Sequence, residues 1–135
     1  MKRNKIIGVD FDGTLATTRG LYPDIGEPIQ EILDYVIEEQ QKGAFIVLIT
    51  MREGVALEMA LAWCQDHGLT FDAVNDNLPH IKDYFEANSR KIFCNEYIDD
   101  RNIGGITYII EQLKDRRRQM TNEPKGPMLS RTESM

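Results

Sequence analysis

The sequence contains little cysteine. Only Cys64 and Cys94 occur among its 135 residues. Neither has a second cysteine or a histidine at the spacing of a zinc finger, and two cysteines do not form a disulfide framework. The small secreted proteins that depend on disulfides are therefore excluded, and we expect two buried thiols.

Long apolar runs and an excess of positive charge are also absent. The longest apolar stretch, around 44–49, has about seven residues, whereas a membrane span needs roughly 20. The N-terminal charges are not followed by a signal-peptide pattern, so we expect a cytoplasmic protein that does not associate with membranes. Sixteen Lys and Arg against 22 Asp and Glu give a net charge of −6, which argues against tight nonspecific binding of nucleic acid.

The length predicts one domain without a full-sized lid. Short apolar runs alternate with amphipathic segments. The predicted strands are 5–10, 44–49, 71–74 and part of 91–99. The predicted helices are one that starts at Glu27–Pro28 and ends before Gly43, one over about 53–67, one turn around 83–85, and one over about 107–119. Pro28 suits a first helical position because its missing N–H would be unpaired there.

This alternation predicts an α/β fold. We expect a three-layer sandwich, with a Rossmann-like parallel sheet, helices on both faces and no cap domain. The domain is placed at 1–118. The remaining segment, 119–135, lacks hydrophobic periodicity and is interpreted as a flexible C-terminal tail.

Polar residues stand where the predicted strands end, which is where ligands bind in parallel sheets. They are Asp10, Asp12, Thr50, Asp99 and Asp100, with Lys91 just before the last strand. Four carboxylates at one rim repel one another unless a cation lies among them. Mg²⁺ prefers such hard oxygen ligands and usually also binds a phosphate oxygen. The sequence therefore predicts a Mg²⁺ site beside a phosphorylated substrate.

The first motif suits phosphoryl transfer. Asp10 and Asp12 are two residues apart, so in an extended chain they point the same way. One carboxylate can attack phosphorus while the other handles a proton, and Phe11 between them would point into the core. Gly13 would let the chain turn and bring backbone N–H groups to phosphate oxygens, and Thr14 could brace the turn.

Each feature also has a plainer interpretation. Asp-x-Asp-Gly is a common turn composition. Thr50 can be a simple strand end, Lys91 a surface lysine, and Asp99–Asp100 a helix cap. The order and placement of all these features together favour a site, in which Thr50 and Lys91 contact the phosphoryl oxygens.

In this order, the motifs resemble those of the haloacid dehalogenase-like hydrolase superfamily, most of whose members are Mg²⁺-dependent phosphatases. Val9–Leu15 is similar to the first motif, a strand followed by DxDGT. Ile46–Thr50 is similar to the second, an apolar strand that ends in Thr or Ser. Lys91 fits the third motif, and Tyr97–Asp100 fits the paired-Asp form of the fourth.

The resemblance implies a role for each catalytic residue. Asp10 would form an aspartyl-phosphate, and Asp12 would act as the general acid and base. Thr50 and Lys91 would bind the phosphoryl group. Arg90, next to Lys91, is an alternative phosphate cation.

The resemblance also implies Mg²⁺ ligands and substrate contacts. The ligand set is Asp10, Asp12, Asp99 and Asp100, with Asp12 contributing its backbone carbonyl. Which of Asp99 and Asp100 binds the metal is left open. The substrate contacts are Gly13, Thr14 and Arg52.

A closer resemblance is to small bacterial and phage members of the superfamily that lack a cap. Its segments are Tyr22–Pro28, Thr50–Gly54, Trp63–Cys64, Ser89–Lys91 and Ile98–Asn102. The gaps after Thr14 and after Thr50 are too short for a folded cap. Arg52 is similar to an arginine in the phosphatase domain of polynucleotide kinases, and its plainer interpretation is an Arg–Asp pair at the rim.

We therefore expect a Mg²⁺-dependent phosphatase acting on a small phosphorylated substrate that the sequence does not identify. One alternative is a phosphatase of nucleic-acid ends, which Arg52 favours and the acidic charge opposes. Another is a non-catalytic phospho-acceptor or interaction module. An open site would leave substrate selection to a neighbouring subunit of a homo-oligomer or to nearby side chains. Those side chains are Tyr22, Arg52, Asn75, Asn77 and His80.

Overall fold

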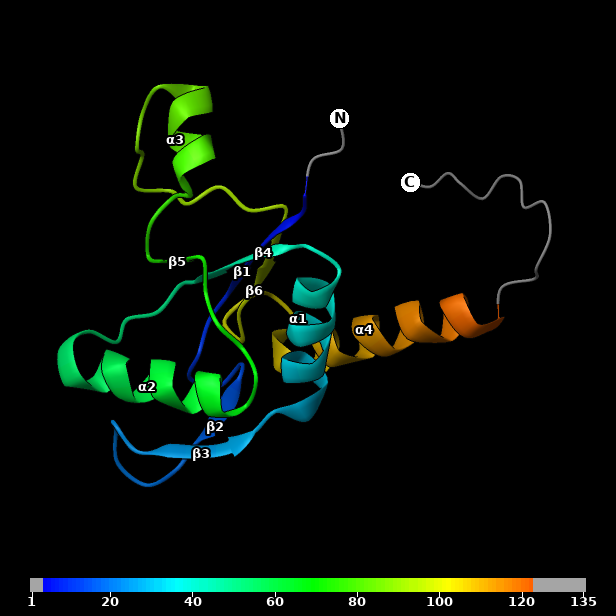
Figure 1. Cartoon of the computed structure of the whole chain (residues 1–135). Helices are drawn as coiled ribbons and strands as arrows, with labels where there is room; N and C mark the ends of the chain where they lie inside the picture. The colour runs from blue at the N-terminus through cyan, green and yellow to red at the C-terminus, as the bar shows by residue number, and fades with distance from the viewer. Residues whose placement is uncertain (1–3, 123–135) are drawn as a thin grey trace.

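A parallel sheet forms the centre of the molecule (Figure 1). The computed structural model describes residues 4–122. The four strands are ordered β5-β4-β1-β6, and they span Ile6–Val9 (β1), Phe45–Leu48 (β4), Ala73–Val74 (β5) and Glu96–Ile98 (β6). The predicted α/β fold is confirmed, and residues 4–122 contain no cap domain.

Helices cover both faces of this sheet (Figure 1). They are α1 (Gln30–Gln41), α2 (Gly54–Asp66), α3 (Pro79–Phe85) and α4 (Gly105–Asn122). Successive strand residues point to opposite faces. Accordingly, Ile7 lies in the larger core, to which α1, α2 and α4 contribute, whereas Ile6 lies in a smaller core with Ile81 of α3. One face is therefore covered by three long helices and the other by one short helix.

A two-stranded antiparallel hairpin, β2 (Ala16–Thr18) and β3 (Ile25–Pro28), was not predicted. The prediction that Pro28 opens a helix was wrong, because Pro28 pairs with Ala16 and ends β3. Extended backbone continues through Ile29, whose N–H donates to the carbonyl of Leu15 at 2.9 Å. Helix α1 consequently begins two residues later than expected.

The final helix is longer than the sequence suggests. It begins at Gly105 and ends at Asn122, so residues 119–122 of the predicted tail are helical. The rest of that tail lies outside the described residues. No helix in 4–122 combines the length and the apolar character needed to cross a membrane. Cys64 and Cys94 are free and buried, as expected.

Candidate active site

The register of the sheet brings the predicted site residues to one rim. Val9 is paired with Leu48 on one side and with Ile98 on the other, so the three strands end at the same level. The N–H of Asp10 donates to the carbonyl of Ile98 at 2.9 Å. Asp10, Thr50 and Asp99 therefore follow neighbouring strands at the carboxyl edge of the sheet, where α/β proteins bind ligands.

The chain turns sharply after Asp10 around a buried phenylalanine. Phe11 has no exposed surface and packs edge-on against Trp63, with ring centroids 5.5 Å apart, which confirms its place in the core. Gly13 has φ +79°, a backbone conformation that costs little only for glycine. Its own N–H donates to the carbonyl of Ala16 at 2.8 Å, so the N–H of Gly13 is used within the turn.

Gly13 has a different role, because it leaves room for a carboxylate. A Cβ atom at this position would lie 2.4 Å from Oδ2 of Asp100, far inside van der Waals contact. Only glycine therefore allows Asp100 to approach the turn.

Three carboxylates converge at this edge. One oxygen each from Asp10, Asp99 and Asp100 lies within 4.8 Å of the others. Burial raises the pKa of Asp10 to about 7, with help from the charge of Asp99 and from Asp100. Neutralising the negative charge of Asp10, either by protonation or by a cation bound next to it, is therefore favourable at this site. Three hard oxygen donors at this spacing fit a divalent ion such as Mg²⁺.

Thr14 holds this carboxylate group together. It is completely buried. Its hydroxyl oxygen accepts the N–H of Asp100 at 3.0 Å and lies 3.4 Å from Oδ2 of Asp10 and 3.3 Å from Oδ1 of Asp100. Thr14 therefore links Asp10 to Asp100, which agrees with the predicted bracing role. Because Thr14 is completely buried, it is not suited to direct contact with a substrate.

Asp12 stands apart from the carboxylate group and is held by Arg52. The guanidinium donates from Nε and Nη2 to the two carboxylate oxygens of Asp12, at 2.8 and 2.9 Å. It also donates to the carbonyls of Ala56 and Pro23, at 2.9 and 3.0 Å, and its Cζ lies 5.0 Å from the ring centres of both Tyr22 and Phe11. Only 1% of the Arg52 surface is exposed, and four of its five side-chain N–H groups donate within the protein, so the geometry supports the Arg–Asp pair rather than contact with a substrate.

This pairing limits how Asp12 can serve a metal. Its carboxylate is not among the three that converge, so its backbone carbonyl is the group left for a metal. The side chain keeps 31% of its surface exposed, in a fixed orientation, and therefore remains accessible to a proton at the rim.

Thr50 has its hydroxyl beside the same edge. It is nearly buried, and its Oγ accepts the N–H of Arg52 at 3.0 Å, which leaves its own O–H as a donor. Asn75, which follows β5, clamps the backbone of Thr50 with two bonds of 2.8 Å, one from each partner. This clamp fixes the end of β4, and Thr50 suits a phosphoryl oxygen as predicted.

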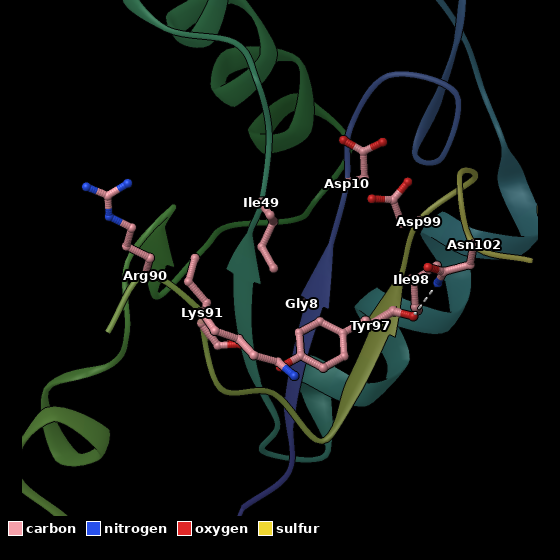
Figure 2. A pocket seen from close by; sticks show the side chains of 10 residues that line it. Gly8, Asp10, Ile49, Arg90, Lys91, Tyr97, Ile98, Asp99 and Asn102 are labelled. Atoms are coloured by element: carbon pink, nitrogen blue, oxygen red, sulfur yellow. Dashed lines mark hydrogen bonds between the residues drawn. The ribbon is translucent and has the colours of Figure 1, made fainter. Parts of the chain in front are cut away.

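Lys91 and Arg90 lie beside a cavity of about 280 Å³ that also contains Asp10 and Asp99 (Figure 2). In this view the Lys91 side chain leads from the loop toward the ring of Tyr97, and Arg90 points away from the strands. Within residues 4–122, no ion pair joins either cation to Asp10. Lys91 and Arg90 therefore share a cavity with the carboxylates without forming an ion pair to Asp10, and Lys91 is the one whose side chain points toward the strands.

Asn77 organises the loop that carries Lys91. It is 4% exposed. Its side-chain nitrogen lies 3.2 Å from Oδ1 of Asn88, 3.2 Å from the carbonyl of Ser89 and 3.4 Å from that of Lys91. Its oxygen accepts the N–H of Phe93 at 2.8 Å. Asn77 is therefore a positioning residue, and its buried amide is not free to select a substrate.

Tyr97 and Asn102 lie in the segments that carry the resemblance but had no predicted role at the site, and both line this cavity. Tyr97 is paired with Gly8 in the sheet, and its hydroxyl donates to the carbonyl of Ile92 at 2.6 Å. The sequence offered one signal for Tyr97: as the neighbour of the buried Ile98 in a strand, its side chain must point to the opposite face of the sheet. Neither Asp99 nor Asp100 caps a helix, since α4 begins at Gly105.

The comparisons with known proteins give one solved structure of clear similarity. It is that of a conserved protein from Bacteroides thetaiotaomicron, 34% identical, with a TM-score of 0.67. The match covers 91% of this chain and the whole of the other. No protein-family model matches the chain, and no curated protein matches it.

Proposed function

Because the chain belongs to the same family as the conserved Bacteroides thetaiotaomicron protein, whose description states no activity, we propose a function from the site itself. The chain is a Mg²⁺-dependent phosphomonoesterase of the haloacid dehalogenase-like superfamily. One observation carries the proposal. A nucleophile candidate, Asp10, lies in a group of three carboxylates, and a fixed and partly exposed carboxylate, Asp12, follows two residues later.

Asp10, Asp99 and Asp100 would hold the metal, together with the backbone carbonyl of Asp12. Both Asp99 and Asp100 belong to the converging group, so each is a candidate ligand. When bound, Mg²⁺ supplies positive charge that keeps Asp10 ionised and offsets charge on the phosphoryl oxygens. A divalent ion thus replaces the proton that the raised pKa of Asp10 favours.

The proposed first step forms a bond between a carboxylate oxygen of Asp10 and phosphorus. The bond from phosphorus to the leaving-group oxygen breaks, and protonated Asp12 gives its proton to that oxygen. The hydroxyl of Thr50 and the ammonium of Lys91 contact the phosphoryl oxygens. Arg52 does not touch the substrate. It fixes both oxygens of Asp12, so that the proton is delivered along one direction.

The second step releases inorganic phosphate. Asp12, now ionised, takes a proton from water as the water oxygen attacks phosphorus. The bond between Asp10 and phosphorus breaks, and both carboxylates return to their starting states. The same Asp12 oxygens serve both steps, so the orientation that Arg52 gives them matters in each.

The polynucleotide-end alternative loses its main support. It depended on Arg52, which is buried and donates four of its five side-chain N–H groups to Asp12 and to backbone carbonyls. The phospho-acceptor alternative is not favoured by any specific contact, since the fixed Asp12 beside Asp10 suits hydrolysis of the acyl phosphate rather than its retention.

The test is hydrolysis of 4-nitrophenyl phosphate with and without Mg²⁺. We expect Mg²⁺-dependent turnover that Asp10→Asn abolishes and that Asp66→Asn, an exposed aspartate on α2, leaves unchanged. Rapid acid quenching followed by mass spectrometry should find phosphate on Asp10. No turnover across a broad panel of phosphate esters, with Mg²⁺ binding confirmed calorimetrically, would contradict the proposal. An Asp10 phosphate that persists for hours would favour the phospho-acceptor alternative.

A further inference from the structure

A second, larger cavity adjoins the one that contains Asp10. Its volume is about 570 Å³, and its lining includes Ile81, Phe85, Lys91, Phe93, Cys94 and Tyr97. Lys91 and Tyr97 line both cavities, so the two cavities are neighbours that share these side chains as a common wall. Most of the additional wall is aromatic or aliphatic.

The cavity exists because the smaller core is poorly covered. Helix α3 has only seven residues, of which Ile81 is buried against the sheet. Beyond it, Phe85, Phe93 and Tyr97 keep 54%, 41% and 42% of their surface exposed. Exposed aromatic side chains gathered around a concavity mark a binding surface more often than chance exposure does. The rings of Phe85 and Phe93 lie 6.1 Å apart, at 49° to each other.

The spacing along the strands relates this surface to the proposed nucleophile. Tyr97 of β6 is paired with Gly8 of the neighbouring strand β1, and Asp10 comes two residues after Gly8, just beyond the end of β1. A rise of about 3.3 Å per residue places the level of Tyr97 roughly 7 Å below that of Asp10. Gly8 lies between the two levels and has no side chain, and Cys94 Sγ and Ile49 Cδ1 pack over it, each 2.7 Å from where a Cβ would lie. Gly8 and Ile49 both line the cavity that leads from Tyr97 to Asp10.

We propose that this second cavity binds the organic part of the substrate, and that this part is a planar aromatic group. This deepens the proposed function and rests on it. The phosphate occupies the Asp10 cavity, and the ring lies over Tyr97 against Phe85 and Phe93. The short separation suits an ester in which the ring is attached to phosphate directly or through a sugar-sized linker.

Charge and shape favour this occupant over others. An ammonium at the junction of the cavities attracts the phosphate, and the walls beyond it are largely uncharged. Aromatic rings offer flat faces and polarised edges, which other rings match better than flexible alkyl chains do. A small aliphatic phosphate would leave the second cavity unused and so gain nothing from it.

Binding of non-hydrolysable phosphonates tests the proposal without catalysis. With Mg²⁺ present, calorimetry should show phenylphosphonate binding at least about tenfold tighter than methylphosphonate, the gain expected of one aromatic contact. Phe85→Ala and Phe93→Ala should each remove most of this difference. The control is Tyr108→Ala on α4, because Tyr108 has the same 54% exposure as Phe85.

Kinetics then identify the source of the ring. Aryl phosphates and nucleoside monophosphates are compared with glycerol phosphate, and the aromatic substrates should have the lower KM. In Phe93→Ala, KM for aromatic substrates should rise about tenfold with kcat retained. Phe93→Leu preserves apolar volume and so tests the ring itself if the alanine variant fails to fold.

The outcomes separate the two proposals. Equal binding of both phosphonates, or hydrolysis of glycerol phosphate as efficient as that of aryl phosphates, would overturn this inference and leave the phosphatase proposal standing. No hydrolysis of any phosphate ester, with Mg²⁺ bound, would overturn the phosphatase proposal and this inference with it.

Discussion

At the scale of single residues, the site depends on how Arg52 is used. A buried arginine that forms two bonds with one carboxylate acts as an orienting group rather than as a substrate ligand. Lysine keeps the charge but cannot reproduce the planar fork. The Arg52–Asp12 pair therefore offers a way to perturb proton transfer without removing the acid.

We expect Arg52→Lys to lower kcat by about 100-fold, the lower end of what general acid catalysis contributes. KM should change little. The loss should be larger for an alkyl phosphate than for 4-nitrophenyl phosphate, whose leaving group needs no proton. The control is Arg101→Lys, because Arg101 is an exposed arginine at the same edge. Equal losses for both substrates would contradict the orienting role.

Gly13 permits a second residue-scale test. In Gly13→Ala the new Cβ would lie 2.4 Å from Oδ2 of Asp100. The backbone at this position is left-handed, with φ +79°, which costs roughly 1–2 kcal/mol for any residue other than glycine. Gly68→Ala is matched, since φ is +88° and nothing lies within 4 Å. Both variants should lose stability in urea denaturation by similar amounts. Only Gly13→Ala should lose the rise in melting temperature that Mg²⁺ causes, because only Asp100 is displaced.

At the scale of elements, the buried strands were predictable and the hairpin was not. The runs in β1 and β4 are continuous and apolar, so their burial shows in the sequence. The strands β2 and β3 have no alternation, and their burial is irregular. One contact distant in sequence holds the hairpin, the bond from Arg52 to the carbonyl of Pro23. Within the hairpin, Gly26 fits tightly against Thr17 of the paired strand.

The candidate site divides in the same way. Asp10, Asp99 and Asp100 come together because parallel strands end together, and that follows from the order of the elements. The partners of Arg52 and Asn77 depend on side-chain directions in loops, which no local pattern encodes. The sequence therefore predicted the carboxylates, the brace at Thr14 and an Arg–Asp pair as one interpretation of Arg52. The structure was needed to show that Asp12 is the partner of Arg52 and that Asn77 holds the Lys91 loop.

The loop from Glu86 to Phe93 provides an element-scale prediction. Asn77→Ala removes four partners of one buried amide and should destabilise the protein by about 1–3 kcal/mol, the cost of leaving buried groups unpaired. Urea denaturation measures this loss, and limited proteolysis should cleave the loop faster. Asn4→Ala is the control, because Asn4 is an exposed asparagine outside this loop and its loss should cost less than about 0.5 kcal/mol. Unchanged proteolysis of the loop in Asn77→Ala would contradict its positioning role.

At the scale of the whole molecule, the acidic charge and the fold act together. The net charge of −6 includes the converging carboxylates at the sheet edge. Their mutual repulsion is a cost that folding creates by bringing strand ends together. A cation relieves it, so metal binding and folding stability should be coupled and should depend on pH.

The sign of that coupling follows from Asp10. Its pKa is raised to about 7 by burial and by neighbouring carboxylates, against about 4 for an unfolded chain. The folded protein therefore holds a proton that the unfolded chain releases, so without metal its stability should fall as the pH rises from about 4 to 7. Added Mg²⁺ should raise the melting temperature more at pH 8 than at pH 5.5, where the proton on Asp10 competes with the metal.

Thermal unfolding of the native chain and of Asp10→Asn tests this prediction, since the asparagine variant should lose both the pH dependence of stability and most of the Mg²⁺ effect. The same rise in melting temperature at both pH values, or a slope that survives in Asp10→Asn, would mean that another group couples protons and metal to folding.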